Sequence, residues 1–268
     1  MNRILTVAGS DSCGGAGVQA DIKTASALGT DAACVITALT AQSADAVYAV
    51  LETPPEMVAG QLDAVFSLLK PGAVKIGMVP TAAAAAVIAA KLAEYGAKNI
   101  VLDPLSAATA GTRLASAEAA AEAERRLFPL ARLLTPNLPE AAALALRLGV
   151  RVTPDRKGAE RAADLLAQRY GCAVLVKGGH AETGADDLLR TEEGLIWLEG
   201  TRLPGSAHGT GCALSSAIAC RLAAGDGLEE AVRAAKRFIT GALTGAEPCG
   251  RSALLNFFWR TEDRASER

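Results

Sequence analysis

Apolar and polar positions follow two alternating patterns along the chain, which predict strands and helices in turn. Short apolar runs such as Val74-Lys75-Ile76 and Ile100-Val101-Leu102 are typical of strands covered on both faces. Longer segments carry apolar residues at helical spacing, for example Val18, Ile22 and Ala25. Strands are expected over residues 3–9, 34–39, 46–51, 74–77, 99–103, 132–135 and 173–177, and helices over 16–28, 55–69, 81–95, 116–127, 139–148, 155–170, 212–223 and 228–243.

This alternation predicts an α/β fold with a mainly parallel central sheet between two layers of helices. It breaks once, where segments 186–190 and 195–199 flank Thr191-Glu192-Glu193-Gly194 and predict an antiparallel hairpin at one side of the sheet. No linker or internal repeat is evident, so residues 1–268 are expected to form one domain, with a flexible charged tail from about residue 260.

Composition narrows the function classes. Aromatic residues make up 4% of the chain, the net charge is −2 and no dense Lys/Arg cluster occurs, so a nucleic-acid partner is not expected. No apolar run reaches membrane-spanning length, and the cytoplasm is the expected location. The six cysteines form no C-x-x-C pair and there are only two histidines, which argues against a zinc ribbon or another structural zinc site.

Polar residues follow most of the predicted strands. Ligands of open α/β sheets bind beyond the carboxyl ends of the parallel strands, so these residues should converge on one site. They are Ser10-Asp11, Thr40-Ala41-Gln42, Met78, Asp103-Pro104, Thr135-Pro136-Asn137 and Lys177-Gly178-Gly179-His180, together with the loop before Cys212.

The loop His208-Gly209-Thr210-Gly211-Cys212 precedes a predicted helix. Its glycines allow a sharp turn, and the amides of Gly209, Gly211 and Cys212 can point at an anion with help from the helix dipole. A thiol in the first helical turn is expected to be more acidic than usual, and Cys212 could then accept a proton from an alcohol. From the local residues alone, a packed, inert thiol is an equally good interpretation.

Four further features each have two interpretations. Segment Gly15-Ala16-Gly17-Val18-Gln19-Ala20 matches G-x-G-x-x-A weakly, and a substrate-covering loop fits equally well. Asp103 and Glu140 are candidate magnesium ligands. Taken singly, the commoner role for Asp103 is a loop cap, and the commoner role for Glu140 is a partner of the helix dipole in the first turn. Lys177 could reach a nucleotide phosphate or be solvated.

Together these segments resemble the ribokinase-like superfamily, and most closely its branch of hydroxymethylpyrimidine/phosphomethylpyrimidine kinases of thiamine synthesis. The similar segments run in family order over nearly the whole chain. They are Ala8-Gly9-Ser10-Asp11, Gly14-Gly15-Ala16-Gly17-Val18-Gln19-Ala20-Asp21, Thr37-Ala38-Leu39-Thr40-Ala41-Gln42, Val74-Lys75-Ile76-Gly77-Met78, Asp103-Pro104, Thr135-Pro136-Asn137-Leu138-Pro139-Glu140-Ala141, Val176-Lys177-Gly178-Gly179-His180 and His208-Gly209-Thr210-Gly211-Cys212.

The resemblance implies a three-layer αβα kinase that uses ATP and Mg²⁺ and forms a homodimer. Its implied substrates are 4-amino-5-hydroxymethyl-2-methylpyrimidine and the monophosphate of that compound, which is converted to the diphosphate. The implied site residues are Cys212, Gly211 and Gly209 for catalysis; Gln42, Gly9, Ala16, Asp21 and Met78 for the substrate; Lys177, Asn137, Thr210 and His208 for the nucleotide; and Asp103 and Glu140 for the metal.

Three departures from the family pattern bear on substrate breadth. Leu105 to Gly111 replaces a bulkier, Met-containing stretch, Cys13 replaces the usual Ser, and Ser206-Ala207 replaces the usual Asn-Thr. A pyridoxal or pyridoxine kinase of the same branch is therefore the nearest alternative. Two other classes are a nucleotide-cofactor oxidoreductase that uses Gly15 to Ala20, and a non-catalytic pyrimidine sensor.

Overall fold

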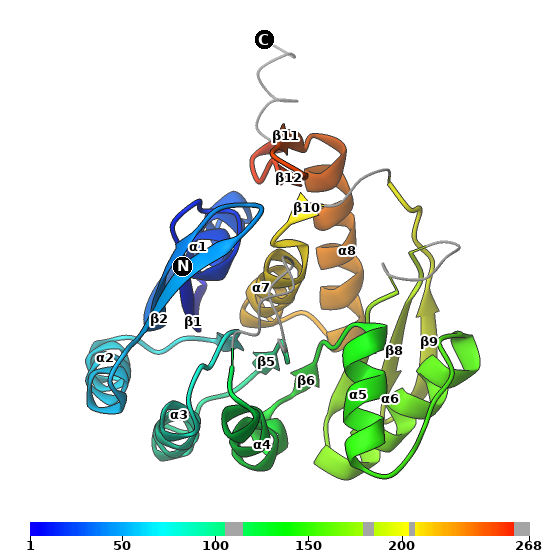
Figure 1. Ribbon diagram of the computed structural model, residues 1–268, viewed down its shortest axis with the longest axis horizontal. Coiled ribbons are helices and arrows are strands. Elements are labelled where there is room, and N and C mark those ends of the chain that lie inside the picture. Colours follow the sequence, from blue (N-terminus) through cyan, green and yellow to red (C-terminus); the bar gives the residue numbers. More distant parts are fainter. Residues whose placement is uncertain (105–114, 179–184, 204–206, 260–268) are drawn as a thin grey trace.

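A computed structural model describes residues 1–104, 115–178, 185–203 and 207–259 and shows a central sheet between two layers of helices (Figure 1). The sheet has nine strands in the order β3-β2-β1-β4-β5-β6-β7-β8-β9. Their bounds are Arg3–Asp11 (β1), Asp31–Gln42 (β2), Val47–Glu52 (β3), Ala73–Ile76 (β4), Ile100–Leu102 (β5), Leu133–Leu134 (β6), Ala173–Val176 (β7), Asp187–Thr191 (β8) and Gly194–Leu198 (β9).

The six strands from β2 to β7 in this order are parallel, which confirms the expected α/β fold. The predicted hairpin is confirmed as β8 and β9, which pair antiparallel at one side. The expectation of a single break is wrong, because β3 pairs antiparallel with β2 at the other side. The two strands are joined by a short turn closed by Ser43 N–H on the Ala46 carbonyl (2.9 Å), and a parallel pairing would need a much longer crossover.

Helices cover both faces of the sheet (Figure 1). One layer contains α2 (Pro55–Leu68), α3 (Ala82–Glu94), α4 (Ala117–Arg126), the short η1 (Phe128–Leu130), α5 (Leu138–Arg147) and α6 (Arg156–Tyr170). The other contains α1 (Gly17–Ala27), α7 (Thr210–Ala223) and α8 (Leu228–Thr244).

Successive side chains of the central strands point to opposite layers. In β5, for example, Ile100 and Leu102 belong to the core under α2–α6, whereas Val101 belongs to the core under α1, α7 and α8. Lys75 in β4 departs from this apolar pattern although it is fully buried. It points toward α1, where Asp21 pairs with it.

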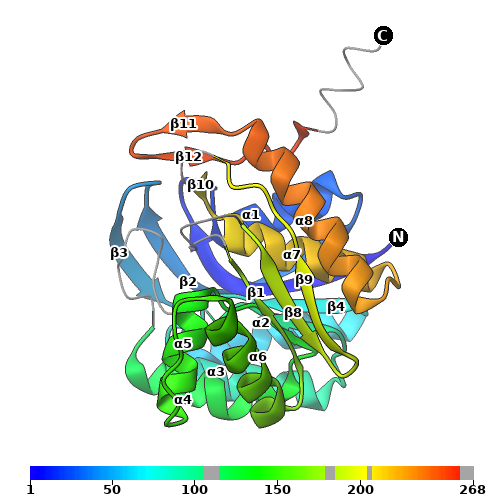
Figure 2. The same cartoon turned by 90° about the vertical axis from the view of Figure 1, so that its right-hand side faces the viewer.

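A second, three-stranded sheet was not predicted from the sequence. It contains β10 (Ala207–His208), β11 (Glu247–Cys249) and β12 (Ser252–Leu254), and lies beyond one end of the main sheet (Figure 2). Strands of two or three residues are too short to show a period. The backbone N–H of Arg251, in the turn of this hairpin, donates to Asp45 Oδ1 (2.8 Å) and so links the hairpin to the β2–β3 turn.

Among the described helices, none is both long enough and apolar enough to cross a membrane. The stretch from Leu105 to Gly111, His180, Ser206 and the tail from residue 260 lie outside the described residues.

Candidate active site

Polar residues at the carboxyl ends of neighbouring parallel strands converge, as the sequence predicted. The order β2-β1-β4-β5-β6-β7 brings the ends of these strands side by side. The residues at or just after these ends are Gln42, Asp11, Met78, Asp103, Asn137 and Lys177, in that order across the sheet. Segment 207–212 connects the two ends of this row, because His208 contacts Asp11 and Gly211 lies against Asp103 and Lys177.

The loop before α7 packs against the glycine cluster that follows β1. Gly209 is the N-cap of α7 and has φ +82°, a conformation that favours glycine, and a side chain there would collide with the Gly15 carbonyl oxygen. At Gly15, a Cβ would lie 2.7 Å from the His208 ring. The glycines therefore permit close contact between the two loops, which favours the covering-loop interpretation of Gly15 to Ala20.

One end of the row forms a charged cluster around Asp103. Its Oδ1 accepts from Lys177 Nζ (2.8 Å) and from the Thr135 hydroxyl (3.1 Å), while its Oδ2 is buried without a hydrogen-bond partner in the described part of the chain. Gly211 lies against both groups, since an added Cβ would be 3.3 Å from Asp103 Oδ2 and from Lys177 Nζ. A carboxylate oxygen without a described partner beside the amides at a helix start suits a magnesium–phosphate group.

The charge of Lys177 is maintained by its neighbours. Burial alone would lower the pKa of Lys177, but the Asp103 and Glu140 carboxylates outweigh burial and raise it. Lys177 is therefore a cation at neutral pH, suitable for contact with a phosphate.

Asn137 and Glu140 begin α5 with a reciprocal capping box. Asn137 Oδ1 accepts from the Glu140 backbone N–H, and Glu140 Oε2 accepts from the Asn137 backbone N–H, both at 2.8 Å. This is the helix-start role considered above as the alternative for Glu140. The proposed contacts of these residues with nucleotide and metal stay predictions.

Cys212 lies in the first turn of α7 and is 7% exposed. Burial raises the pKa of its thiol, and the nearby Lys75 ammonium lowers it by less. The expectation of an unusually acidic thiol is therefore wrong, because desolvation of the thiol outweighs the attraction of the Lys75 ammonium. At neutral pH Cys212 carries its proton and can donate a hydrogen bond.

Asp21, expected among the substrate residues, lies beneath the row of strand-end residues and not in it. It is fully buried, and its carboxylate accepts from Lys75 Nζ (2.9 and 2.8 Å) and from the Ser216 hydroxyl (2.7 Å). Burial alone would lower the pKa of Lys75, but Asp21 outweighs burial and raises it. Ser216 is one helical turn beyond Cys212, so Asp21 and Lys75 support the start of α7 from behind. A lysine within the apolar run 74–76 was the sequence signal for this pair.

The other end of the row joins Gln42, His208 and Asp11. Gln42 Nε2 is 3.1 Å from His208 Nε2, which is 2.9 Å from Asp11 Oδ2. His208 is therefore placed with the expected substrate residues, not at Lys177 with the nucleotide residues. Sequence reasoning noted Asp11 at a strand end but gave it no role.

Asp11 organises the loop that follows β1. Its Oδ2 accepts from the backbone N–H of Ala16 (2.7 Å) and of Gly15 (3.1 Å). Burial alone would raise the pKa of Asp11, but hydrogen bonds from His208 and Ala16 outweigh burial and lower it. The ionised carboxylate thus holds the loop in place.

Gly9 and Met78 lie close together between the two ends of the row, since a Cβ on Gly9 would be 2.9 Å from Met78 Sδ. Thr210 is the first residue of α7 and is partly exposed. The structure thus brings all the predicted site residues to one edge of the sheet except Asp21, which lies beneath it.

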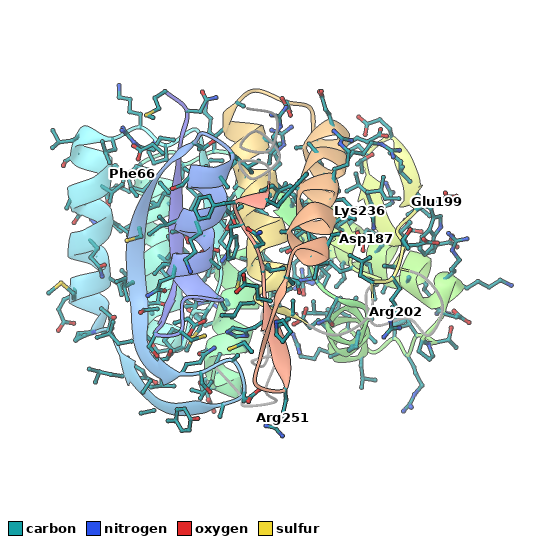
Figure 3. The ribbon with its side chains drawn as sticks, turned by 90° about the horizontal axis from the view of Figure 1, so that it is seen from above. Phe66, Asp187, Glu199, Arg202, Lys236 and Arg251 are labelled. Atoms are coloured by element: carbon teal, nitrogen blue, oxygen red, sulfur yellow. The ribbon has the colours of Figure 1, made fainter. Side chains whose placement is uncertain are left out.

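Gly178, the residue after Lys177, is anchored by a partly buried ion pair. The Gly178 N–H donates to Asp187 Oδ1 (2.9 Å), and Asp187 Oδ2 accepts from Lys236 Nζ (2.6 Å) of α8 (Figure 3). A groove elsewhere, lined by Arg132, Ala173, Thr191 and Leu228 among others, lies near the amino ends of β6 and β7 and is remote from these residues.

The sequence matches the phosphomethylpyrimidine kinase family over residues 11–255, most of the chain. The chain belongs to this family. It is 46% identical over 245 residues to the hydroxymethylpyrimidine/phosphomethylpyrimidine kinase of Rhizobium meliloti, with 91% of each chain covered. It is 45% identical over 250 residues to the thiamine biosynthesis bifunctional protein ThiED of Geobacter sulfurreducens, with 92% of this chain covered but only 50% of that longer protein.

Solved structures of the same fold include phosphomethylpyrimidine kinase from Clostridium difficile, with a TM-score of 0.80, 38% identity and coverage of 91% of this chain and 100% of that one. Bacillus subtilis pyridoxal kinase, solved as an ADP complex, has a TM-score of 0.88, 29% identity and coverage of 97% and 99%. This phosphomethylpyrimidine kinase family member is therefore a kinase with a ribokinase-like fold, as the sequence predicted.

Proposed function

We propose that the protein phosphorylates 4-amino-5-hydroxymethyl-2-methylpyrimidine and then its monophosphate, with ATP as donor, in thiamine biosynthesis. The observation that carries this proposal is the single row of residues from Gln42 to Lys177. One end offers an amide for a pyrimidine ring, and the other offers a cation and helix-start amides for phosphates. Cys212 lies in the first turn of α7, directly after the loop that joins them.

The proposed reaction is in-line attack by the hydroxymethyl oxygen on the γ-phosphorus of ATP. A P–O bond forms to the alcohol as the bond to the bridging oxygen breaks, and ADP and a proton are released. Lys177 and the amides of Gly209 to Cys212 stabilise the negative charge of the transferring group. Because its thiol is protonated, Cys212 orients the alcohol by a hydrogen bond and is not a preformed base.

Mg²⁺ fits the phosphate end, where Asp103 has a buried Oδ2 without a partner among the described residues. We infer that Asp103 holds the ion, directly or through water, with Glu140 nearby. An ion held there would supply positive charge that neutralises the phosphates of ATP.

Product analysis tests the function. Incubation with ATP, Mg²⁺ and the hydroxymethylpyrimidine should give first the monophosphate and then the diphosphate. Formation of the monophosphate alone would limit the proposal to its first step, and no consumption of pyrimidine would contradict the proposal.

Pyridoxal is the second candidate substrate, because the fold is shared with Bacillus subtilis pyridoxal kinase. Its ring and hydroxymethyl group are similar in shape to those of the pyrimidine. We expect kcat/KM to be lower for pyridoxal than for the hydroxymethylpyrimidine, and the reverse order would make pyridoxal the preferred substrate.

We also propose a homodimer. Leu39, Tyr48, Val50 and Leu51 are exposed apolar side chains of β2 and β3, with exposed fractions of 50%, 72%, 42% and 69%. Leu39 and Leu51 pair across the two strands and so form an apolar patch on one face of the sheet. The patch lies at an edge of the sheet. There β3 pairs with β2 on one side, and the other side of its backbone faces outward from the described sheet. Exposed apolar side chains gathered at a sheet edge are typical of an interface.

A further inference from the structure

Asp11, Cys13 and His208 bring three metal-ligating atoms together beside Gln42. Asp11 Oδ2 is 2.9 Å from His208 Nε2 and 3.3 Å from Cys13 Sγ, and all three atoms lie within 4.8 Å of one another. The residues come from the end of β1, the loop after it and β10, so their spacing in the sequence shows no metal motif.

The separations suit a tetrahedral cation. Ligand bonds of about 2.0 Å for imidazole and carboxylate and about 2.3 Å for thiolate place neighbouring ligand atoms about 3.3–3.7 Å apart. The contact between Cys13 Sγ and Asp11 Oδ2 (3.3 Å) lies at the lower end of this range, and the contact between His208 Nε2 and Asp11 Oδ2 (2.9 Å) is shorter. Such shorter distances are expected where a proton, not a metal ion, joins the two atoms. A cation could enter with a small outward movement of the imidazole and the thiol.

The surroundings orient the carboxylate for such a role. Asp11 Oδ1 accepts from the Cys13 N–H (3.0 Å), while Ala16 and Gly15 hold its Oδ2 from the loop side. Metal sites commonly contain such outer hydrogen bonds, which fix the direction of the ligands. Asp11 and His208 are both buried, and Cys13 is partly exposed and leaves a route for entry.

We propose that Asp11, Cys13 and His208 bind a thiophilic divalent cation such as Zn²⁺, at a site separate from the magnesium–phosphate end at Asp103. One thiolate, one imidazole and one carboxylate select zinc-like ions over Mg²⁺, which prefers oxygen ligands alone. On binding, the thiol releases its proton to solvent, and the imidazole proton moves from Nε2 to Nδ1. Three protein ligands leave the fourth position for water.

Occupation of this site inhibits the kinase, a consequence that rests on the proposed substrate role of Gln42. The amide nitrogen of Gln42 is 3.1 Å from the same His208 Nε2 that would hold the cation. A metal ion there draws His208 away from Gln42 and places a charge beside the pyrimidine ring. Zn²⁺ is therefore expected to compete with the pyrimidine and not with ATP.

Titration of the full-length protein with Co²⁺, in the absence of nucleotide, tests the binding site. We expect one equivalent with the visible bands of tetrahedral cobalt and a thiolate-to-metal charge-transfer band. Cys13→Ser should lose the charge-transfer band. Its affinity for Zn²⁺, measured by competition with a chromophoric chelator, should fall by more than about 10-fold. Cys34→Ser, which changes another partly buried thiol, is the matched control and should behave as wild type.

A measurement on the wild-type chain avoids any folding defect of the variant. Alkylation of Cys13 by iodoacetamide, followed by peptide mass spectrometry, should be slowed by Zn²⁺ and restored by chelator, with Cys34 unaffected. An unchanged cobalt spectrum in Cys13→Ser, or no protection of Cys13, would overturn the metal site. These readouts need no substrate, so their failure is distinct from failure of the kinase assay.

Discussion

At the scale of single residues, the thiol of Cys212 has the clearest chemical consequence. Burial keeps it protonated at neutral pH, and it lies between the two ends of the row. We expect Cys212→Ala to lower kcat by about 100-fold or more, the range of lost proton-handling groups, with little change in pyrimidine affinity. Cys212→Ser, which keeps a hydrogen-bond donor, should retain more activity. Steady-state kinetics and equilibrium binding check both, and an unchanged kcat in Cys212→Ala would exclude the role.

The pH dependence of kcat follows from the same burial. Because the folded pKa of Cys212 is raised, its thiolate appears only above the ordinary thiol pKa of about 8.5. Because the protonated thiol is the hydrogen-bond donor, any fall of kcat with pH that depends on its ionisation should therefore lie above that value. The pH profiles of kcat for the wild type and for Cys212→Ser should differ in shape only above this pH. A limb below pH 8 that disappears in the variant would mean that the thiol is acidic.

Lys75 illustrates a residue whose importance comes from stability. Its ammonium and the Asp21 carboxylate are both fully buried and paired, so Lys75→Met leaves an unpaired buried charge. The expected loss in unfolding free energy is about 3–5 kcal/mol, measured by urea denaturation. Lys91→Met breaks a more exposed ion pair with Asp63 by the same side-chain change and should have little effect. Equal effects of the two would contradict this account.

At the scale of elements, the start of α7 depends on its contact with the loop after β1. Gly209→Ala introduces left-handed strain of about 1–2 kcal/mol together with a collision with Gly15, and should displace the loop and reduce kcat strongly. Gly225→Ala at the other end of α7 also has positive φ, +99°, but meets open space. It should lose some stability and keep kcat. Similar activities for the two variants would show that the contact is unimportant.

The elements themselves were largely predictable from the sequence, whereas several contacts were not. Strands covered on both faces must be apolar, and helices must have one apolar face, so local periodicity located both. The β11–β12 hairpin is too short for such a period. The pairs Lys75–Asp21 and His208–Asp11 join residues 54 and 197 positions apart. A lysine in an apolar run signals that a buried partner exists, but no local pattern identifies which residue that partner is. For Cys212, the helix start suggested an acidic thiol, but only the structure showed its burial.

At the scale of the whole molecule, the apolar patch on β2 and β3 predicts self-association. Sedimentation or light scattering should show a dimer for the wild-type chain. Leu51→Lys, in the patch, should shift it toward monomer, whereas Leu146→Lys, at an exposed leucine on α5, should not. A wild-type chain that remains monomeric at micromolar concentration would contradict the proposed dimer.

The alternation of side chains along the central strands has a consequence for how the protein unfolds. Each strand supplies both cores, so removal of either helical layer would expose apolar side chains on the strands that the remaining core needs. The two layers are therefore expected to melt cooperatively as one domain. Far-ultraviolet circular dichroism and tryptophan fluorescence, from Trp197 beside one core and Trp259 beside the other, should report the same denaturation midpoint.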